Sequence, residues 1–181
     1  MLRVSYPDDV LARARRIRLI GFDVDGTLTD GRLVYASDGQ DNKAFHVQDG
    51  MGLVLLRESG IQVALVTART SSEVERRGRE LGLPHIHVGE RGKLACMQRI
   101  AGQLGVGMDE VAFMGDDLPD LAAMRAAGLA IAPANAHAWA LDVAHWTTPR
   151  RGGEGAARDA CDLLLHAQGR TGAILAHGEH P

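Results

Sequence analysis

The sequence predicts an α/β protein built on a doubly wound parallel sheet, and three observations lead to this fold class. Apolar residues make up 45% of the 181 residues and aromatic residues only 4%, a composition typical of aliphatic strands covered by Ala-rich helices. Short apolar runs alternate with helical patterns along most of the chain. The length suits one folded unit. We therefore expect a single domain over residues 1–169 and a flexible tail over residues 170–181.

The first part of the chain predicts a helix, a buried strand and a hairpin. A proline followed by two aspartates favours a helix over residues 7–14, because proline needs no donor in the first turn and acids suit the dipole. The apolar run at residues 17–24 is typical of a buried parallel strand that ends in a polar turn. Residues 32–35 and 44–47 flank a turn at residues 37–40 and predict a hairpin, or flap, after this strand.

The rest of the chain alternates strands with helices. A capping-box pattern at residues 70–73 marks the start of the helix that reaches Leu81. Further helices are expected over residues 52–59, 93–104, 118–127, 138–143 and 156–168, and strands over residues 63–67, 85–88, 111–114, 129–132 and, at an edge, 145–147. This alternation implies a Rossmann-like parallel sheet.

Charge and cysteine usage narrow the class of partner. Twenty basic and 23 acidic residues give a formal charge of −3, and the two signs are interspersed, so we expect neither nucleic acid nor a membrane as partner. Cys96 and Cys161 have no metal-binding spacing and are interpreted as reduced core residues. Arginines near the N-terminus interrupt any signal-peptide core or membrane span, so a cytoplasmic protein is expected.

Polar side chains follow four successive strands, and ligands of open α/β sheets bind at these carboxyl ends. The residues are Asp23, Asp25 and Thr27 after the first strand, Thr67 after the second, Lys93 after the third, and Asp116, Asp117 and Asp120 after the fourth. Three gathered carboxylates repel one another unless a cation neutralises them, and an all-oxygen set suits Mg²⁺ better than zinc. Lys93 in a first helical turn opposes the dipole, which a nearby anion would explain.

Each of these signals also has a structural interpretation. An Asp-Gly-Thr sequence is a common turn, and Asp116 or Asp117 could simply cap the helix that begins near Leu118. Only the convergence of all of them at one edge of the sheet favours a site.

The four motifs, in their order, resemble those of the haloacid dehalogenase superfamily of phosphatases. The resemblance implies that Asp23 attacks phosphorus and that Asp25 is the general acid and base. It also implies a Mg²⁺ ion held by Asp23, the backbone carbonyl of Asp25, and Asp116, with Thr67 and Lys93 on the phosphate. Asp117 and Asp120 would orient the ligand, Lys93 or the loop.

A narrower resemblance concerns residues 43–50, whose sequence Lys-Ala-Phe-His-Val-Gln-Asp-Gly is similar to the signature of 3-deoxy-D-manno-octulosonate 8-phosphate phosphatases. Further similar segments are residues 67–69, 74–77, 115–120 and 152–158. The chain has no room for a cap domain. The resemblance implies a homotetramer whose neighbouring subunits complete each site, a small sugar-acid phosphate as substrate, and a place in lipopolysaccharide precursor synthesis. It implies substrate contacts from His46, Val47, Gln48, Asp49, Gly50, Arg69 and Arg77.

Two departures from this signature leave alternatives open. Thr27 stands where the family often has valine, and Val54 stands where it commonly has arginine, which removes a substrate contact. A phosphatase for another acidic sugar phosphate, such as a nonulosonate 9-phosphate, or a broader phosphomonoesterase is the second hypothesis. A non-catalytic sugar-phosphate-binding oligomeric module is the third. For individual residues, Arg77 could belong to a solvated helix face and His46 to an ordinary hairpin.

Overall fold

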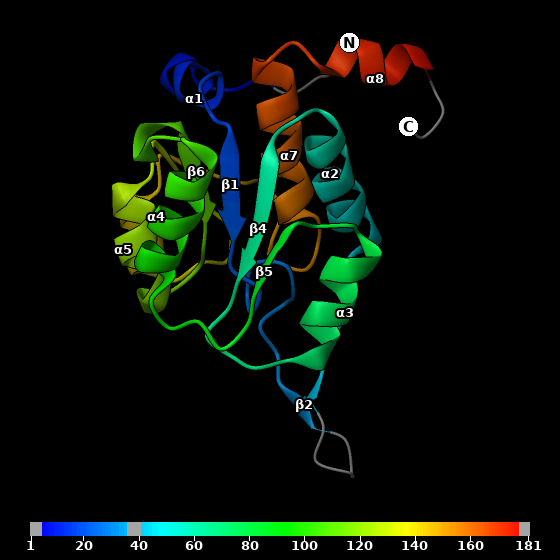
Figure 1. The fold of residues 1–181 in the computed structure, drawn as a ribbon, viewed down its shortest axis with the longest axis vertical. Helices are drawn as coiled ribbons and strands as arrows, with labels where there is room; N and C mark the ends of the chain where they lie inside the picture. The colour runs from blue at the N-terminus through cyan, green and yellow to red at the C-terminus, as the bar shows by residue number, and fades with distance from the viewer. Residues whose placement is uncertain (1–4, 36–40, 178–181) are drawn as a thin grey trace.

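The fold is centred on a six-stranded parallel sheet. Figure 1 shows the computed structural model, which describes residues 5–35 and 41–177. The strand order is β5-β4-β1-β6-β7-β8. The strands are β1 (Leu19–Phe22), β4 (Gln62–Val66), β5 (His85–His87), β6 (Val111–Met114), β7 (Leu129–Ala132) and β8 (Trp146–Thr147). The chain winds outward from β1 to β5 and then returns to β6 on the other side of β1, so the switch point of the sheet lies at β1.

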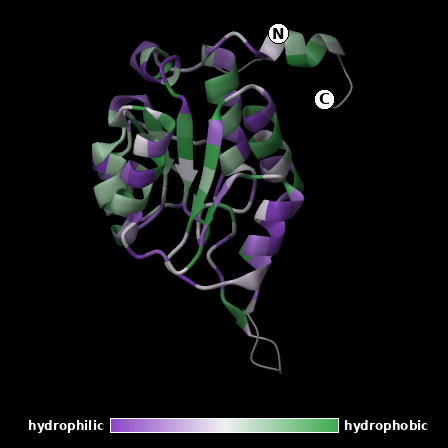
Figure 2. Cartoon of the chain, viewed as in Figure 1, coloured by the Kyte–Doolittle hydropathy of each residue, from purple (hydrophilic) through white to green (hydrophobic). Residues whose placement is uncertain are grey.

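Helices cover both faces of this sheet. On one face lie α1 (Asp8–Ala14), α2 (Val47–Glu58) and α7 (Ala156–Ala167), and on the other α4 (Lys93–Leu104), α5 (Leu121–Ala126) and α6 (Ala138–Val143). Strand β4 shows the alternation, since Val63 and Leu65 join the first apolar cluster and Ala64 and Val66 the second. Figure 2 shows the apolar residues concentrated in the sheet and the inner helix faces. The predicted doubly wound α/β fold is confirmed.

The insertion after β1 is small. The described part contains the two-stranded flap, β2 (Val34–Tyr35) and β3 (Asp41–Asn42), followed by α2. Between β4 and β6 the chain forms only α3 (Ser72–Glu80), β5, α4 and the 3₁₀ turn η1 (Met108–Glu110). These described segments contain no cap domain. In Figure 1 the flap extends beyond the carboxyl ends of β1 and β4, next to α3.

The flap and α2 differ from the sequence-based expectation. The predicted second arm at residues 44–47 is wrong, because Val34 pairs with Asn42 and Tyr35 with Asp41, which closes the hairpin earlier. Helix α2 then begins at Val47, five residues before the expected start. The turn expected at residues 37–40 lies outside the described residues. The early end of the pairing leaves residues 43–46 to run back toward the sheet.

Other boundaries shift less. Helix α3 is capped by Ser71, whose Oγ accepts a hydrogen bond from the amide of Val74 at 3.3 Å, so the cap lies one residue after the one expected. The helix predicted over residues 118–127 is divided into the 3₁₀ turn η2 (Leu118–Asp120) and α5.

The expected tail contains a helix, α8 (Thr171–His177), which the sequence pattern did not indicate. Ile174 packs against the main apolar cluster, and the amide of Arg170 bonds to the carbonyl of Leu165 in α7. Helix α8 is therefore stabilised by contacts with the rest of the molecule, and its own sequence shows no helical pattern of apolar residues. The mobility of residues 170–181 stays a prediction.

No helix among the described residues combines the length and the apolar character that crossing a membrane requires.

Candidate active site

A tight turn after β1 brings two aspartates to the switch point of the sheet. The carbonyl oxygen of Val24 accepts hydrogen bonds from the amides of Leu28 and Thr29 at 2.9 and 3.0 Å, which folds the segment back on itself. Gly26 has a φ of +96°, and a Cβ there would lie 2.2 Å from Oδ2 of Asp116. Glycine is therefore required at this position, and its small size lets the β6 carboxylate approach the β1 turn.

Asp23, Lys93 and Asp120 form a buried charge cluster. Nζ of Lys93 donates to Oδ1 of Asp23 and to Oδ1 of Asp120, each at 2.5 Å. The other oxygen of Asp120 accepts from the amides of Asp116 and Asp117 at 3.0 and 3.2 Å. Although burial lowers the pKa of Lys93, Asp23 and Asp120 raise it above its ordinary value. Asp120 thus ties Lys93 to the loop that carries Asp116.

The carboxylates of this cluster fit a divalent cation. Ligand atoms of Asp23, Asp116 and Asp120 lie within 4.8 Å of one another. Burial, and then the charge of Asp120, raises the pKa of Asp23 well above its ordinary value and that of Asp116 to about 6. Lys93 balances only part of this negative charge. An oxygen-only donor set with excess negative charge is the kind that Mg²⁺ prefers.

Asp25 is held from two sides by hydrogen-bond donors. Its Oδ2 accepts from Oγ1 of Thr67 at 3.3 Å, and its Oδ1 forms an ion pair with Nζ of Lys43. The side chain of Lys43 is only 4% exposed. Sequence reasoning did not select Lys43 as a site residue, although a signal was present. The chain has 20 basic residues and only two of them are lysines, and both pair with the aspartates that follow β1.

Asp117 lies outside this buried cluster. It is the N-cap of η2, where its Oδ1 accepts from the amide of Leu118 at 2.7 Å, and its side chain is exposed. The capping interpretation of Asp117 accounts for this contact.

Two residues predicted to bind substrate contact the first turn of α7 and the loop that precedes it. Oδ1 of Asp49 accepts from the amide of Arg158 at 2.7 Å, and Oε1 of Gln48 accepts from the Arg150 guanidinium at 3.0 Å. Asp49 is 2% exposed, and burial raises the pKa of its carboxyl. Substrate contact by Asp49 stays a prediction that its burial does not support. Gly50 is buried beside the Arg77 guanidinium.

The remaining predicted contacts lie around the start of α2 and the end of β4. His46 is the N-cap residue of α2 in an extended conformation, and Val47 is 79% exposed. The amide of Arg69 donates to Oγ1 of Thr67 at 3.3 Å. Arg77 is paired with Glu80 at 3.5 Å. Val47 is thus the one of these that the fold leaves most open to a ligand or to a neighbouring chain.

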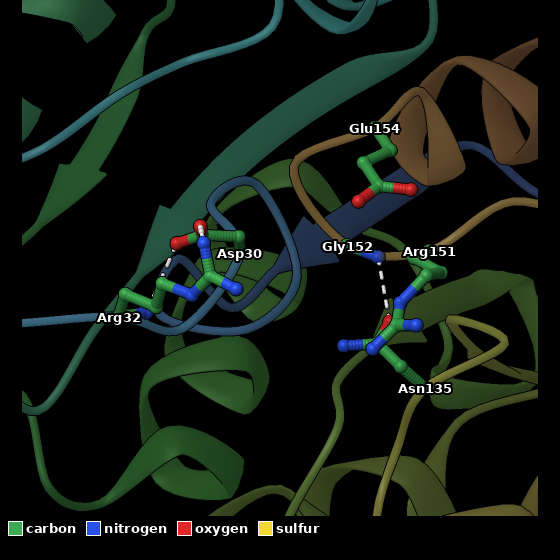
Figure 3. Close-up of a pocket in the computed structure, with 6 residues that line it drawn as sticks. All are labelled: Asp30, Arg32, Asn135, Arg151, Gly152 and Glu154. Carbon is green, nitrogen blue, oxygen red and sulfur yellow. Dashed lines mark hydrogen bonds and ion pairs between the residues drawn. The ribbon is translucent and has the colours of Figure 1, made fainter.

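The glycine-rich loop before α7 packs against the turn that carries Asp25. The amide of Gly152 donates to Oδ1 of Asn135 at 2.8 Å, and the amide of Gly153 to the carbonyl of Thr27 at 3.2 Å. A Cβ on Gly152 would lie 1.8 Å from the carbonyl oxygen of Gly26. Figure 3 shows the polar pocket beside this contact, of about 210 Å³, lined by Asp30, Arg32, Asn135, Arg151, Gly152 and Glu154. The loop therefore supports the turn after β1 from outside the carboxylate cluster.

Comparison with known proteins gives a consistent assignment. Residues 52–128 match the family of haloacid dehalogenase-like hydrolases. The chain is 41% identical over 172 residues to the 3-deoxy-D-manno-octulosonate 8-phosphate phosphatase of Yersinia pestis, covering 93% of this chain and 92% of that one. This chain belongs to that phosphatase family.

Solved structures agree with this membership. A phosphatase of the same family from Moraxella catarrhalis, solved with magnesium, phosphate and 3-deoxy-D-manno-octulosonate, is 41% identical, with a TM-score of 0.93 over 96% of this chain and 100% of that one. A hypothetical protein of Xanthomonas campestris is 50% identical, with a TM-score of 0.95 over 98% of this chain and 97% of that one. The high coverage in both directions is in accord with a fold that carries no cap domain.

Proposed function

We propose that this phosphatase hydrolyses 3-deoxy-D-manno-octulosonate 8-phosphate to the free sugar acid and phosphate, with Mg²⁺ as cofactor, in the synthesis of lipopolysaccharide precursors. The observation that carries the proposal is the pairing of buried Asp23 with Lys93 at 2.5 Å, with Asp25 two residues further on. The sequence relationship to the octulosonate 8-phosphate phosphatases supports this substrate. The chain is a phosphoric monoester hydrolase.

In the first step, an oxygen of Asp23 attacks phosphorus while the bond between phosphorus and the sugar oxygen breaks. Asp25 gives a proton to that oxygen, so the sugar leaves as a neutral alcohol and an aspartyl-phosphate remains. Lys93 and Thr67 bind the phosphoryl oxygens; Lys93 already contacts Asp23, and Thr67 already contacts Asp25. Their fixed positions reduce the entropy that must be lost when phosphate is held in line.

In the second step, water attacks phosphorus and the ionised Asp25 takes its proton. The bond between phosphorus and the Asp23 oxygen breaks, which releases phosphate and restores the carboxylate. The same side chain thus returns to its protonated form for the next turnover.

Asp23, Asp116 and the backbone carbonyl of Asp25 would hold the Mg²⁺ ion. When bound, Mg²⁺ neutralises negative charge between the nucleophile and the phosphoryl oxygens. The two oxygens of Asp120 are already engaged, one by Lys93 and the other by two backbone amides. For this reason we assign Asp120 to the support of the site rather than to the ion.

A related acidic sugar phosphate, such as a nonulosonate 9-phosphate, is the second candidate substrate. Val54, on α2, supplies no cationic group at the position where the octulosonate signature commonly has arginine. This difference is the reason to consider the second substrate. Arg69 and Arg77 supply guanidinium groups suited to a sugar-acid carboxylate in either case.

The proposed assembly is a homotetramer in the cytoplasm. Leu33, Val34 and Tyr35, in and just before β2, are 44%, 54% and 66% exposed, and several large apolar side chains exposed on one short segment are typical of contact with another chain. A neighbouring subunit on the flap would cover a site that has no cap of its own. The two buried free cysteines accord with a reducing compartment.

Phosphate release from a panel of sugar phosphates tests the proposed function. We expect the highest kcat/KM with 3-deoxy-D-manno-octulosonate 8-phosphate. Asp23→Asn should lower kcat by at least about 10³-fold, because the amide is a poor nucleophile. Asp109→Asn serves as the matched control, since Asp109 is an exposed carboxylate paired with Arg16 at 3.6 Å.

The outcomes separate the hypotheses. A preference for the nonulosonate 9-phosphate would transfer the assignment to the second candidate. Retention of activity in Asp23→Asn would show that Asp23 is not the nucleophile. If the wild-type protein hydrolyses none of the phosphates, the non-catalytic binding module is favoured.

A further inference from the structure

We infer that Lys43 is a positioning residue that aims the Asp25 carboxylate at the leaving oxygen, so that the flap is part of the catalytic apparatus. The inference rests on the proposed function, because it concerns the proton transfer assigned to Asp25. The contact itself is direct: Nζ of Lys43 forms an ion pair with Oδ1 of Asp25.

The two oxygens of Asp25 have different partners from separate parts of the fold. Oδ2 accepts from Thr67 at the end of β4 at 3.3 Å, and Oδ1 accepts from Lys43, which directly follows β3. A carboxylate with one donor can rotate about its side-chain torsions. Each donor occupies one lone pair of an oxygen and leaves the other for the proton that is transferred, so the lysine determines which direction the carboxyl group faces.

Because the Lys43 side chain is buried, its ammonium group must stay close to the Asp25 carboxylate. The side chain of Lys43 is 4% exposed and that of Asp25 is 23% exposed. An ammonium withdrawn from water needs a close carboxylate to offset its lost hydration. Glu73 also contributes negative charge near Lys43, although its carboxylate is almost fully in water. Asp25 is therefore the partner on which the buried lysine depends.

The position of Lys43 in the chain couples the flap to the reaction. The β2–β3 pairing ends at Asn42, the partner of Val34. Lys43 is the next residue, so a displacement of the flap moves the ammonium relative to Asp25. This gives the flap a role in catalysis.

The use of lysine in this sequence agrees with that role. Only Lys43 and Lys93 occur among 20 basic residues, and they pair with Asp25 and Asp23, respectively. A compact ammonium donates as a point charge, whereas a guanidinium needs a planar fork. The other basic residues of the chain are arginines, and both lysines pair with the two aspartates proposed to react.

A series of substrates that differ in the basicity of the leaving oxygen tests the inference. The series is p-nitrophenyl phosphate, phenyl phosphate and 3-deoxy-D-manno-octulosonate 8-phosphate, and the quantity is kcat/KM, which covers the steps up to departure of the leaving group and excludes hydrolysis of the aspartyl-phosphate. Proton donation matters more as the leaving oxygen becomes more basic. For Lys43→Met we expect a loss of less than about 3-fold with p-nitrophenyl phosphate, rising to about 10-fold or more with the sugar phosphate.

Two further variants keep the test independent of folding. Lys43→Arg retains the charge but changes the direction of donation, and it should show the same graded loss at a smaller size. Arg32→Met removes an exposed cation from the segment just before β2, where it is paired with Asp30 at 3.7 Å, and should leave all three kcat/KM values unchanged. Thermal unfolding of each variant reports its stability.

The results that overturn the inference are specific. Equal losses with all three substrates would assign Lys43 to phosphate binding or to folding. A loss confined to the sugar phosphate, with the two aryl phosphates unaffected, would assign it to direct contact with the sugar. If the wild-type protein does not turn over the sugar phosphate, the proposed function fails, and the two aryl phosphates still test the role of Lys43.

Discussion

At the scale of single residues, the hydroxyl group of Thr27 orients a carboxylate of this site. Oγ1 of Thr27 donates to Oδ1 of Asp116 at 3.2 Å, and Thr27 is fully buried. The hydrogen bond depends on the hydroxyl group of Thr27. It fixes one proposed metal ligand against the turn that carries the other.

Thr27→Val should therefore weaken Mg²⁺ binding without disrupting the fold. Valine matches the shape of threonine but cannot donate to Asp116, and loss of a hydrogen bond to a metal ligand typically lowers affinity by about 10-fold. Isothermal titration of Mg²⁺ into protein freed of metal measures the change.

Thr148→Val is the control for loss of a buried hydroxyl. Thr148 donates to the carbonyl of Arg150 at 2.8 Å and not to a proposed metal ligand, so its replacement should leave the Mg²⁺ affinity unchanged. Wild-type affinity in Thr27→Val would show that Asp116 needs no such support.

Contacts between elements decide where the loops of the site lie. Helix α7 begins after Gly155, which has no side chain to cap the first turn. Asp49, on α2, supplies the missing acceptor to the amide of Arg158. The pairing of α2 with α7 thus anchors the glycine-rich loop that packs against the turn that carries Asp25.

Asp49→Ala should destabilise the protein by about 1–2 kcal/mol, the usual cost of losing a helix cap. In a chain of this length, this corresponds to a fall in Tm of roughly 2–8 °C. Thermal unfolding followed by circular dichroism measures it.

Gln48→Ala provides the comparison for this element. Gln48 is the neighbouring residue and makes an exposed hydrogen bond to Arg150, so its loss should change stability by less than about 0.5 kcal/mol. Equal Tm values for the two variants would mean that the cap contributes nothing.

At the scale of the whole molecule, the flap is the surface that a neighbouring subunit would cover. The flap stands beyond the carboxyl edge of the sheet (Figure 1) and carries exposed apolar side chains. In a homotetramer the same surface would repeat by symmetry, so a single charged substitution would act at every copy of the contact.

Tyr35→Glu should shift the protein toward smaller species in sedimentation velocity and reduce turnover of the sugar phosphate. The reason is that a charge buried in an apolar contact loses its hydration without compensation. Trp139→Glu, on α6, is the control, since Trp139 is also exposed, at 53%. An active monomeric wild-type protein would end the proposal of a shared site.

The sequence by itself determined the parts of the protein that depend on local pattern. Helix α4, strands β6 and β7, and helix α6 have the expected bounds, because their apolar periodicity coincides with their final burial. The same holds for the cluster around Asp23, Lys93 and Asp116, since carboxyl ends of parallel strands must meet at one edge of a sheet.

Only the tertiary structure decided the rest. The capping of α7 by Asp49 joins residues 109 positions apart, and the pairing of Lys43 with Asp25 depends on where the flap closes. Helix α8 likewise forms where packing against α7 is available. Local propensity contains no information about such partners, because their energy comes from groups that meet only after the chain has folded.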